Sequence, residues 1–352
     1  MIARARRFFA FALRFKGMID RERKSKSGLG LLERWSAWRR GFVSESLMIY
    51  EMNKRPEVYL SDYARHVRTP DINERFKSVL DNKFIFSRMF GADVLRTPQV
   101  YFWLDRGKTF AFRDGKVVKT EAADVITLCR EKSRLIVKSV DGGGGANVFA
   151  IEVKDGQALI NHRKVQAADL ERLLASRTNA IAIEFAEQHP YARDIFPLAT
   201  NTVRVLTMWD YDAGCPFIAA AVHRFGRTPT IPVDNWSRGG LSVAIDLERG
   251  CLGRGIMHPS TGDREWHSTH PETGQQIEGV GIPGWGSIRT KILHAASTAP
   301  FLPYIGWDVV VTEDGFVVLE GNNFSDVNLL QVHQPLLGDP RVRNFYEYHG
   351  VI

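Results

Sequence analysis

The chain has 352 residues, 44% of them hydrophobic and 25% charged, which is ordinary for a globular protein and allows two or three packed subdomains. Its three cysteines, Cys129, Cys215 and Cys251, are far apart, which argues against a disulfide framework or a zinc site and favours a reducing cytoplasmic setting. The net charge of +7 arises in residues 1–40, where 12 basic residues face three acidic ones, so the rest of the chain gives no reason to expect nucleic-acid binding.

Residues 1–70 are predicted to form a basic helical region. The first 24 residues mix arginines with phenylalanines, which suits an amphipathic helix lying on the inner face of a membrane or on an acidic partner. Two alternatives stay open: a first helix that packs its phenylalanines, among them Phe8 and Phe9, on the body, and a targeting presequence. No apolar run approaches the roughly 18 residues of a spanning helix, and no signal peptide is evident, so we expect a cytoplasmic protein.

Helical patterns continue to about residue 91. From residue 31 to about residue 68 the expected apolar face consists of Trp35, Trp38, Phe42, Leu47 and Tyr50. A further helical segment covers residues 71–91 and contains Lys83 after Asp81-Asn82. An apolar strand and a strand pair with Asp-Gly at its centre follow, and then a helix over residues 122–131.

The next predicted strand carries Lys138 and ends in a glycine run, Gly142, Gly143, Gly144 and Gly145. Bare glycine amides can close over phosphate groups, and Lys138 lies where an ammonium can reach phosphate oxygens. No Gly-Lys-Ser/Thr follows, so the run is not a Walker A loop. A loose turn is the alternative interpretation.

A hairpin and a helix over residues 167–175 lead to an apolar strand that carries Glu184 and ends near Ala186 and Gln188. We interpret this strand as a linker between two subdomains. Such a linker offers backbone N–H and C=O groups to an adenine edge, with side chains free for its amino group or the ribose. An interior strand with exposed acids is the alternative.

Arginines stand at strand positions in the second half of the chain. Arg204 alternates with core-directed residues and therefore points to the opposite face, and Arg224 ends the following strand. Asn235 and Arg238 come just before a Gly-Gly pair, where a ligand can approach the backbone. Guanidinium groups bind phosphate and carboxylate bidentately, although an isolated arginine is more often a surface salt-bridge former. Residues 258–286 are predicted to form a loop over the site.

The most informative stretch is a hairpin near the C-terminus, with strands over residues 307–312 and 316–320 joined at an Asp-Gly turn. Antiparallel pairing brings Asp308, Glu320 and Asn322 together at one end of it. Two carboxylates and an amide oxygen suit Mg²⁺, which takes the rest of its ligands from water and phosphate. A surface hairpin with solvated acids is the alternative, but Glu320 caps an apolar run and would need a cation or a donor there.

These segments occur in a distinctive order. They read LDNKFIFSRMFG, LIVKSVDGGGGANV, QHPYARDIFPLATNTVRVLT, NWSRGGLSVAIDLERG, HPETG and GWDVVVTEDGFVVLEGNN. The ordered set, over about residues 71–337, resembles the ATP-grasp superfamily, most closely its sugar-transfer-associated branch, which is related to glutamate ligases. The resemblance implies an α+β ATP-grasp fold. Residues 71–187 and 188–352 would form two subdomains that sandwich ATP, preceded by the basic helical region 1–70.

The resemblance also implies roles for individual residues. ATP binding falls to Lys83, Lys138, Gly142, Gly143, Gly144, Gly145, Glu184, Ala186 and Gln188. Metal binding (Mg²⁺ or Mn²⁺) falls to Asp308, Glu320 and Asn322. Catalysis falls to Arg204, Arg224 and Lys138, and substrate contacts to Asn201, Asn235 and Arg238. Two departures stand out: the glycine loop lacks the serine common in the family's lid, and residues 1–70 do not read as the α/β domain that usually precedes the core.

The implied reaction joins a carboxylate to an amine through an acyl phosphate at the expense of ATP. The expected substrates are a small-molecule, glycan or peptide carboxylate and an amine, in polysaccharide, envelope or peptide-conjugate biosynthesis. Two alternatives remain: an ATP-grasp kinase that phosphorylates a hydroxyl, and a nucleotide-binding regulatory module recruited to a membrane or an acidic partner by residues 1–40.

Overall fold

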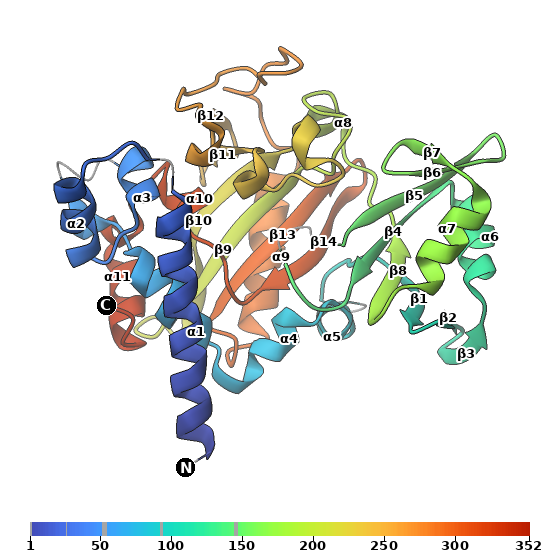
Figure 1. Ribbon diagram of the computed structural model, residues 1–352, viewed down its shortest axis with the longest axis horizontal. Helices are drawn as coiled ribbons and strands as arrows, with labels where there is room; N and C mark the ends of the chain where they lie inside the picture. The colour runs from blue at the N-terminus through green and yellow to red at the C-terminus, as the bar shows by residue number, and fades with distance from the viewer. Residues whose placement is uncertain (1, 26, 51–54, 92–93, 144–146) are drawn as a thin grey trace.

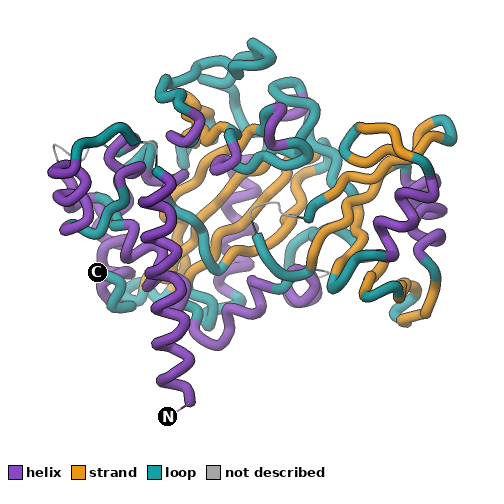
Figure 2. The backbone as a smooth tube through the Cα atoms, viewed as in Figure 1, coloured by secondary structure: helices purple, strands orange, loops and turns teal. Residues whose placement is uncertain are grey.

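Two antiparallel sheets form the body of the protein in a computed structural model that describes residues 2–25, 27–50, 55–91, 94–143 and 147–352. One sheet has eight strands and the other six, and they stand side by side with helices packed around them (Figures 1 and 2). The predicted α+β architecture is therefore confirmed. The boundaries proposed at residues 70 and 187 stay a prediction.

The eight-stranded sheet has the order β3-β2-β1-β8-β4-β5-β6-β7. Its strands are β1 (Val100–Asp105), β2 (Lys108–Arg113), β3 (Lys116–Thr120), β4 (Arg134–Ser139), β5 (Phe149–Lys154), β6 (Gln157–Ile160), β7 (Arg163–Val165) and β8 (Ala180–Glu184). The Asp-Gly turns predicted from the sequence close the β2–β3 and β5–β6 hairpins. Asp114 and Gly115 both have positive φ, 50° and 73°, as the tight turn requires.

One face of this sheet packs against helices α6 (Ala122–Lys132) and α7 (Ala167–Ala175). Along β4, Val137 belongs to that core, so its neighbour Lys138 points to the opposite face. That opposite face contains Ile181 and Ile183 of β8 and looks toward the six-stranded sheet. Strand alternation thus carries Lys138 to the space between the two sheets.

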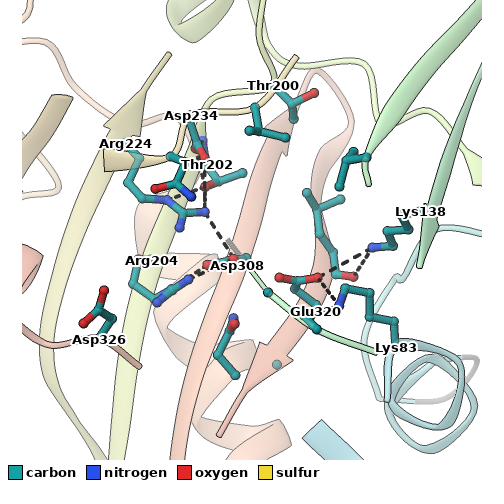
Figure 3. Close-up of a pocket in the computed structure, with 18 of the residues that line it drawn as sticks. Lys83, Lys138, Thr200, Thr202, Arg204, Arg224, Asp234, Asp308, Glu320 and Asp326 are labelled. Atoms are coloured by element: carbon teal, nitrogen blue, oxygen red, sulfur yellow. Dashed lines mark hydrogen bonds and ion pairs between the residues drawn. The ribbon is translucent and has the colours of Figure 1, made fainter. Parts of the chain in front are cut away.

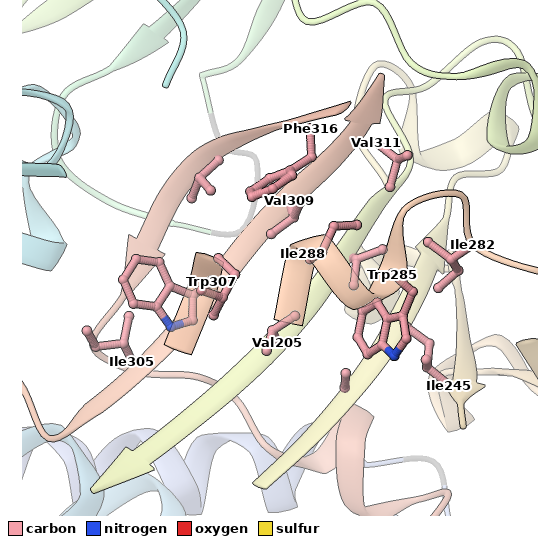
Figure 4. Packing of buried hydrophobic residues seen from close by; sticks show 14 of the residues in the cluster. Val205, Ile245, Ile282, Trp285, Ile288, Ile305, Trp307, Val309, Val311 and Phe316 are labelled. Atoms are coloured by element: carbon pink, nitrogen blue, oxygen red, sulfur yellow. The ribbon is translucent and has the colours of Figure 1, made fainter. Parts of the chain in front are cut away.

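The six-stranded sheet has the order β12-β11-β10-β9-β13-β14. Its strands are β9 (Thr202–Asp210), β10 (Cys215–Phe225), β11 (Leu241–Ile245), β12 (Leu252–Met257), β13 (Tyr304–Thr312) and β14 (Gly315–Asn322). The β13–β14 hairpin confirms the strand pair predicted near the C-terminus. Helix α9 (Trp285–Ser297) covers one face, where Trp285 and Ile288 pack with Val205 and Val309 (Figure 4).

The other face of this sheet holds the residues that alternate with that core. At one end, Leu206 and Tyr304 pack with apolar residues of the N-terminal region and with helix α11 (Pro340–Tyr348). Arg204 and Asp308 lie on the same face, because each is an even number of residues from Leu206 or Tyr304. The strand period therefore directs these two charges away from α9.

The N-terminal region is helical, as predicted. It contains α1 (Ile2–Lys24), α2 (Leu31–Arg39) and α3 (Ser44–Ile49), and α4 (Lys77–Asp81) and α5 (Lys83–Phe90) follow it. Two short helices, α8 (Pro190–Arg193) and α10 (Asn328–Gln331), lie in the second half. None of the described helices is both long and apolar enough to pass through a bilayer.

Buried polar contacts fix this region to the body. The Gln331 amide of α10 accepts from Leu60 N at 3.0 Å and donates to Leu60 O at 2.9 Å.

The apolar face predicted for residues 31–68 is confirmed only in part. Phe42 and Tyr50 are buried as expected, whereas Trp35 is 60% exposed and does not belong to the apolar face predicted for it. The side chains of Phe8 and Phe9 lie outside the described part of the chain.

Candidate active site

A cavity of about 710 Å³ lies between the two sheets. Strands β4 and β8 line it from one side and β9, β10, β13 and β14 from the other, and the first glycines of the loop after β4 complete it. Figure 3 shows its charged side chains converging from both sheets. They separate into a lysine end and an arginine end.

At the lysine end, two ammonium groups share one carboxylate. Lys83 Nζ lies 3.6 Å and Lys138 Nζ 3.8 Å from Glu320 Oε2. Asn82 caps helix α5 by accepting from Ile85 N, which fixes Lys83 at the first helical position. Both distances to Glu320 exceed a normal hydrogen bond. The two ammonium groups carry one more charge than Glu320, and Asp81 and Asp141 also line the cavity. The arrangement can therefore accept an anion such as a phosphate.

Lys138 is 7% exposed, and its ammonium donates to Leu319 O at 3.3 Å. Burial lowers the pKa of Lys138 to about 8; Glu320 opposes this shift and Lys83 adds to it. Lys83 Nζ in turn donates to the carbonyl of Gly142 at 2.5 Å, which ties α5 to the start of the glycine loop. The lysine end can therefore bind a negatively charged ligand.

At the arginine end, strand register sets the contacts. The β9–β13 pairing places Arg204 beside Asp308, and the β13–β14 pairing places Glu320 on the other side of Asp308. Arg204 donates through Nε to Asp308 Oδ1 at 2.5 Å and through Nη2 to Oδ2 at 3.0 Å. Arg224 Nη2 lies 3.1 Å from the same Oδ2. Asp308 is 4% exposed, so its charge depends on these two guanidinium groups.

The titration of Asp308 reflects these contacts. Burial raises the pKa of its carboxyl, but Arg204 and Arg224 outweigh burial and hold the pKa at about 2. Arg224 also lies 3.3 Å from Asp234, and the attraction of Asp234 and Asp308 raises the pKa of Arg224 in spite of its burial. Asp308 and Arg224 are therefore charged throughout the physiological pH range, whereas burial raises the pKa of the Asp234 carboxyl.

Asp234 and Thr202 are parts of this site that sequence reasoning missed. Asp234 Oδ2 accepts from Thr202 N at 2.7 Å and from Thr202 Oγ1 at 2.6 Å, and Arg224 Nε donates to Thr202 Oγ1 at 3.0 Å. Asp234 lies in a polar segment between strands, where nothing local distinguishes it from a surface residue. Its contacts with Arg224 and Thr202, which form only in the folded protein, make it part of the site.

The three predicted metal ligands, Asp308, Glu320 and Asn322, all line the cavity but differ in their contacts. Asn322 Nδ2 donates to Gly306 O at 3.2 Å, and this contact does not engage the side-chain oxygen of Asn322. Both oxygens of Asp308 already receive arginine donors. Within the described ranges, no three His, Cys, Asp or Glu side chains are grouped to hold a metal ion. Glu320 and Asn322 fit Mg²⁺ only if water and phosphate oxygens complete the shell.

Other predicted ligand residues also line the cavity: Gly142, Gly143, Glu184, Ala186 and Asn235. Glu184 is held in place by Gln99 N, which donates to its Oε2 at 3.1 Å. Gly144 and Gly145 lie outside the described residues. The remaining cavity residues come from both sheets, from helices α1, α4 and α10, and from the loops after β4, before β9, before β11 and after β14.

Gln188, Asn201 and Arg238 are not among the residues that line the cavity. Asn201 is 1% exposed and donates to Gln188 Oε1, while Gln188 Nε2 donates to Ala199 O at 2.9 Å. The two amides therefore brace the segment that leads into β9. Arg238 is exposed, at the end of a 3₁₀ turn.

The N-terminal helix α1 reaches the cavity as well. Arg21 lines it and donates to His66 Nε2 at 2.7 Å. Burial, reinforced by Arg65 and Arg21, keeps the pKa of His66 far below its usual range, so His66 is the neutral acceptor. Asp326, which pairs with Arg65, lies at the same end. No sequence signal pointed to Arg21, because a single arginine in a basic helix is unremarkable.

A family model described as sugar-transfer associated ATP-grasp matches residues 63–344. Among solved structures, D-alanyl-alanine synthetase A from Vibrio cholerae aligns with 10% identity and a TM-score of 0.43, over 76% of this chain and 66% of that one. A RimK domain ATP-grasp protein from Sphaerobacter thermophilus gives 12% identity and a TM-score of 0.40, over 76% and 67%.

An L-amino acid ligase from Bacillus licheniformis gives 11% identity and a TM-score of 0.37, over 70% of this chain and 41% of that one. The present chain thus spans less than half the length of that enzyme. No functionally curated protein matches the sequence significantly. With all three TM-scores below 0.5, these structures support no statement about the chemistry of this chain.

Asp308 and Glu320 are expected to respond differently to neutralisation. Asp308→Asn leaves two buried arginines without their shared anion and should lower the free energy of unfolding by about 3–5 kcal/mol. Glu320→Gln should stay within about 1 kcal/mol of wild type, because Glu320 accepts only long contacts at the cavity wall. Urea denaturation measures both. Equal losses in the two variants would contradict the structural role assigned to Asp308.

The affinity for ADP should fall above pH 8, because Lys138 then loses the proton that attracts phosphate. An ordinary lysine keeps its charge to about pH 10. Below pH 8 this group contributes no pH dependence; above it, affinity should weaken by up to about tenfold per pH unit. Calorimetric titration between pH 6.5 and 9.5 tests this. The control is the Lys138→Met variant, which should bind ADP weakly at every pH, with no fall in affinity above pH 8. If the variant shows the same fall as wild type, another group causes the pH dependence.

Proposed function

The chain belongs to the sugar-transfer associated ATP-grasp family, and we propose that it is an ATP-dependent carboxylate–amine ligase. In this reaction a substrate carboxylate oxygen attacks the γ-phosphorus of ATP and ADP leaves. The nitrogen of an amine then attacks the acyl carbon, phosphate leaves, and the amine loses a proton to give an amide. One observation carries the proposal: a cavity between two sheets combines a lysine end that can take phosphates with an arginine end that can take a carboxylate.

The lysine end would bind the nucleotide phosphates. Lys83 and Lys138 bring two positive charges to one carboxylate, so a phosphate can approach without first displacing a tight ion pair. The glycine loop starts at Gly142, whose carbonyl holds Lys83, and its amides would close over the phosphates. Glu184 and Ala186 would border the adenine on the neighbouring strand.

Glu320 and Asn322 would hold Mg²⁺, which when bound neutralises phosphate charge in the transition state. Glu320 lies within 4 Å of both lysines, so the same carboxylate would orient the lysines as well as the metal. Asp308 would act mainly by holding Arg204 and Arg224 in place. Its assignment as a direct metal ligand remains a prediction, because both of its oxygens accept arginine donors.

The arginine end would bind the acid substrate and stabilise the oxyanion that develops at its carbonyl carbon. Arg224 lines the cavity, and no hydrogen bond of its Nη1 to another described residue is seen, so the two N–H groups of this nitrogen are available. Asp308, Asp234 and Thr202 fix the rest of the guanidinium group, which removes the cost of orienting it during the reaction. No nucleophilic side chain is required by this scheme.

The cavity charges and the family description support a proposal for the substrates. An acid that meets both Arg224 and Arg21, which line the same cavity, would carry a carboxylate and further polar groups, as a uronic acid or a peptide does. Asn235, which lines the cavity, would contact such an acid. Arg238 and Asn201 were predicted to contact substrate, but they do not line the cavity, so they would act only indirectly. We propose a glycan- or peptide-derived carboxylate and an amine as the two substrates.

The proposed reaction predicts a specific transfer of oxygen. With a carboxylate labelled by ¹⁸O, one labelled oxygen should appear in the released phosphate, because the acyl phosphate is cleaved at its carbonyl carbon. The test screens uronic acids and short peptides with a panel of amines for ADP release and analyses the phosphate by mass spectrometry. Arg224→Met should reduce turnover about 10²–10³-fold, the usual effect of removing one oxyanion donor.

Arg238→Met is the matched control, since Arg238 is exposed and does not line the cavity. It should retain turnover close to that of wild type. ADP release that requires an acceptor hydroxyl but no amine, with unlabelled phosphoryl product, would replace the ligase with a kinase. Loss of turnover in Arg238→Met equal to that in Arg224→Met would remove Arg224 from its assigned role.

A further inference from the structure

Helix α2 presents a continuous apolar face to solvent. Leu31 and Leu32 are each 84% exposed and Trp35 is 60% exposed. Trp35 follows Leu32 by three residues and Leu31 by four, and both spacings bring helical side chains together, so the three form one patch, which we call the α2 patch. Single exposed apolar residues are common on protein surfaces, but three large ones together indicate an interaction site.

The α2 patch is part of the folded structure. On the inner side of α2, Ala37 is fully buried, and Arg34 Nε donates to Glu22 Oε1 of α1 at 2.9 Å. Arg34 Nη2 also donates to Glu22 O at 3.2 Å, and Glu22 accepts from Ser44 of α3. These contacts lock the helix in one orientation. Leu31, Leu32 and Trp35 are therefore held outward by the packing of the opposite side.

Two arginines border the patch at the C-terminal end of α2, and one exposed acid, Glu33, lies in its first turn. Arg39 lies over the Trp35 ring, with its guanidinium carbon 4.8 Å from the ring centroid, and Arg40 follows it at the end of the helix. Both arginines are exposed. An aromatic ring, two leucines and two arginines on one helix form the combination that peripheral membrane helices use.

A bilayer accounts for this combination better than an acidic protein does. Tryptophan prefers the boundary between lipid headgroups and acyl chains, and arginine binds lipid phosphates beside it. The patch lies on one nine-residue helix at the outer edge of the molecule, away from the eight-stranded sheet (Figure 1). A lipid surface can accept such a helix without a complementary groove.

We propose that the α2 patch docks the protein on an anionic membrane surface. Leu31, Leu32 and Trp35 enter the headgroup region, and Arg39 and Arg40 contact lipid phosphates. The proposal does not depend on the ligase reaction, since no α2 residue lines the cavity. It places the membrane contact on α2, within the residues 1–40 that the sequence suggested for a membrane or an acidic partner, rather than on the phenylalanines of the first helix.

Sedimentation with vesicles tests the proposal. The full-length protein is mixed at low salt with vesicles of phosphatidylcholine alone or with one third phosphatidylglycerol. Wild type should pellet with the anionic vesicles, bind the neutral ones far less, and lose binding as salt rises. Leu31→Ser/Leu32→Ser/Trp35→Ser should reduce the partition coefficient by about tenfold or more. Arg39→Glu/Arg40→Glu should lose the preference for anionic lipid.

The matched control is Val117→Ser/Val118→Ser, which removes two exposed apolar side chains, 63% and 48% exposed, from β3. It should bind vesicles as wild type does, and far-ultraviolet circular dichroism should show every variant folded. Wild-type protein that stays in the supernatant with anionic vesicles would overturn the proposal, and so would unchanged binding by the triple variant. A wild-type dimer that the triple variant converts to a monomer, without vesicle binding, would assign the patch to self-association instead.

Discussion

The buried charge of Asp308 is the constraint on which the arrangement of the cavity depends. A carboxylate that is 4% exposed is tolerated only with cations and donors around it, and Arg204 and Arg224 supply both. The three residues come from three adjacent strands, β13, β9 and β10, so their contacts exist only in one strand register. A shift of the strand register by one residue would point the side chain of Asp308 or Arg204 into the apolar core beneath α9. The sheet and the arginine end therefore specify each other.

The two ends of the cavity differ in how tightly their charges are matched. At the arginine end, Asp308 and Asp234 balance Arg204 and Arg224, and Thr202 binds both Asp234 and Arg224. At the lysine end, Lys83 and Lys138 exceed Glu320 by one charge and lie beyond hydrogen-bond distance from it. Firm contacts suit groups that must stay oriented. Loose contacts with excess charge suit groups that exchange a partner when an anionic ligand arrives. The proposed assignment of phosphates and carboxylate to the two ends follows from this contrast.

Sequence reasoning succeeded where local chemistry decides the structure. Asp-Gly turns predicted the hairpins, and the period of two placed Arg204 opposite Val203 and Val205. It predicted that Asp308 and Glu320 are neighbours, and the β13–β14 register confirms this. Sequence reasoning could not show that Arg204 and Arg224 both bind the Asp308 carboxylate, because these contacts depend on how strands distant in sequence pair. For the same reason Gln188 and Asn201 read as ligand residues, although in the fold their amides bind each other. Trp35 was predicted to be part of a buried face, because helical periodicity shows that apolar residues share a face. It does not show whether another element covers that face.

The central claim is that the cavity binds a nucleotide whose phosphates lie at the lysine end, with Glu320 carrying the metal. Calorimetric titration of the wild type and of Glu320→Ala with ATP, each with and without Mg²⁺, tests it most directly. The account predicts that Mg²⁺ strengthens ATP binding in the wild type and has no such effect in Glu320→Ala. A folded wild-type protein that binds no ATP, or a variant that keeps the full effect of Mg²⁺, would contradict it.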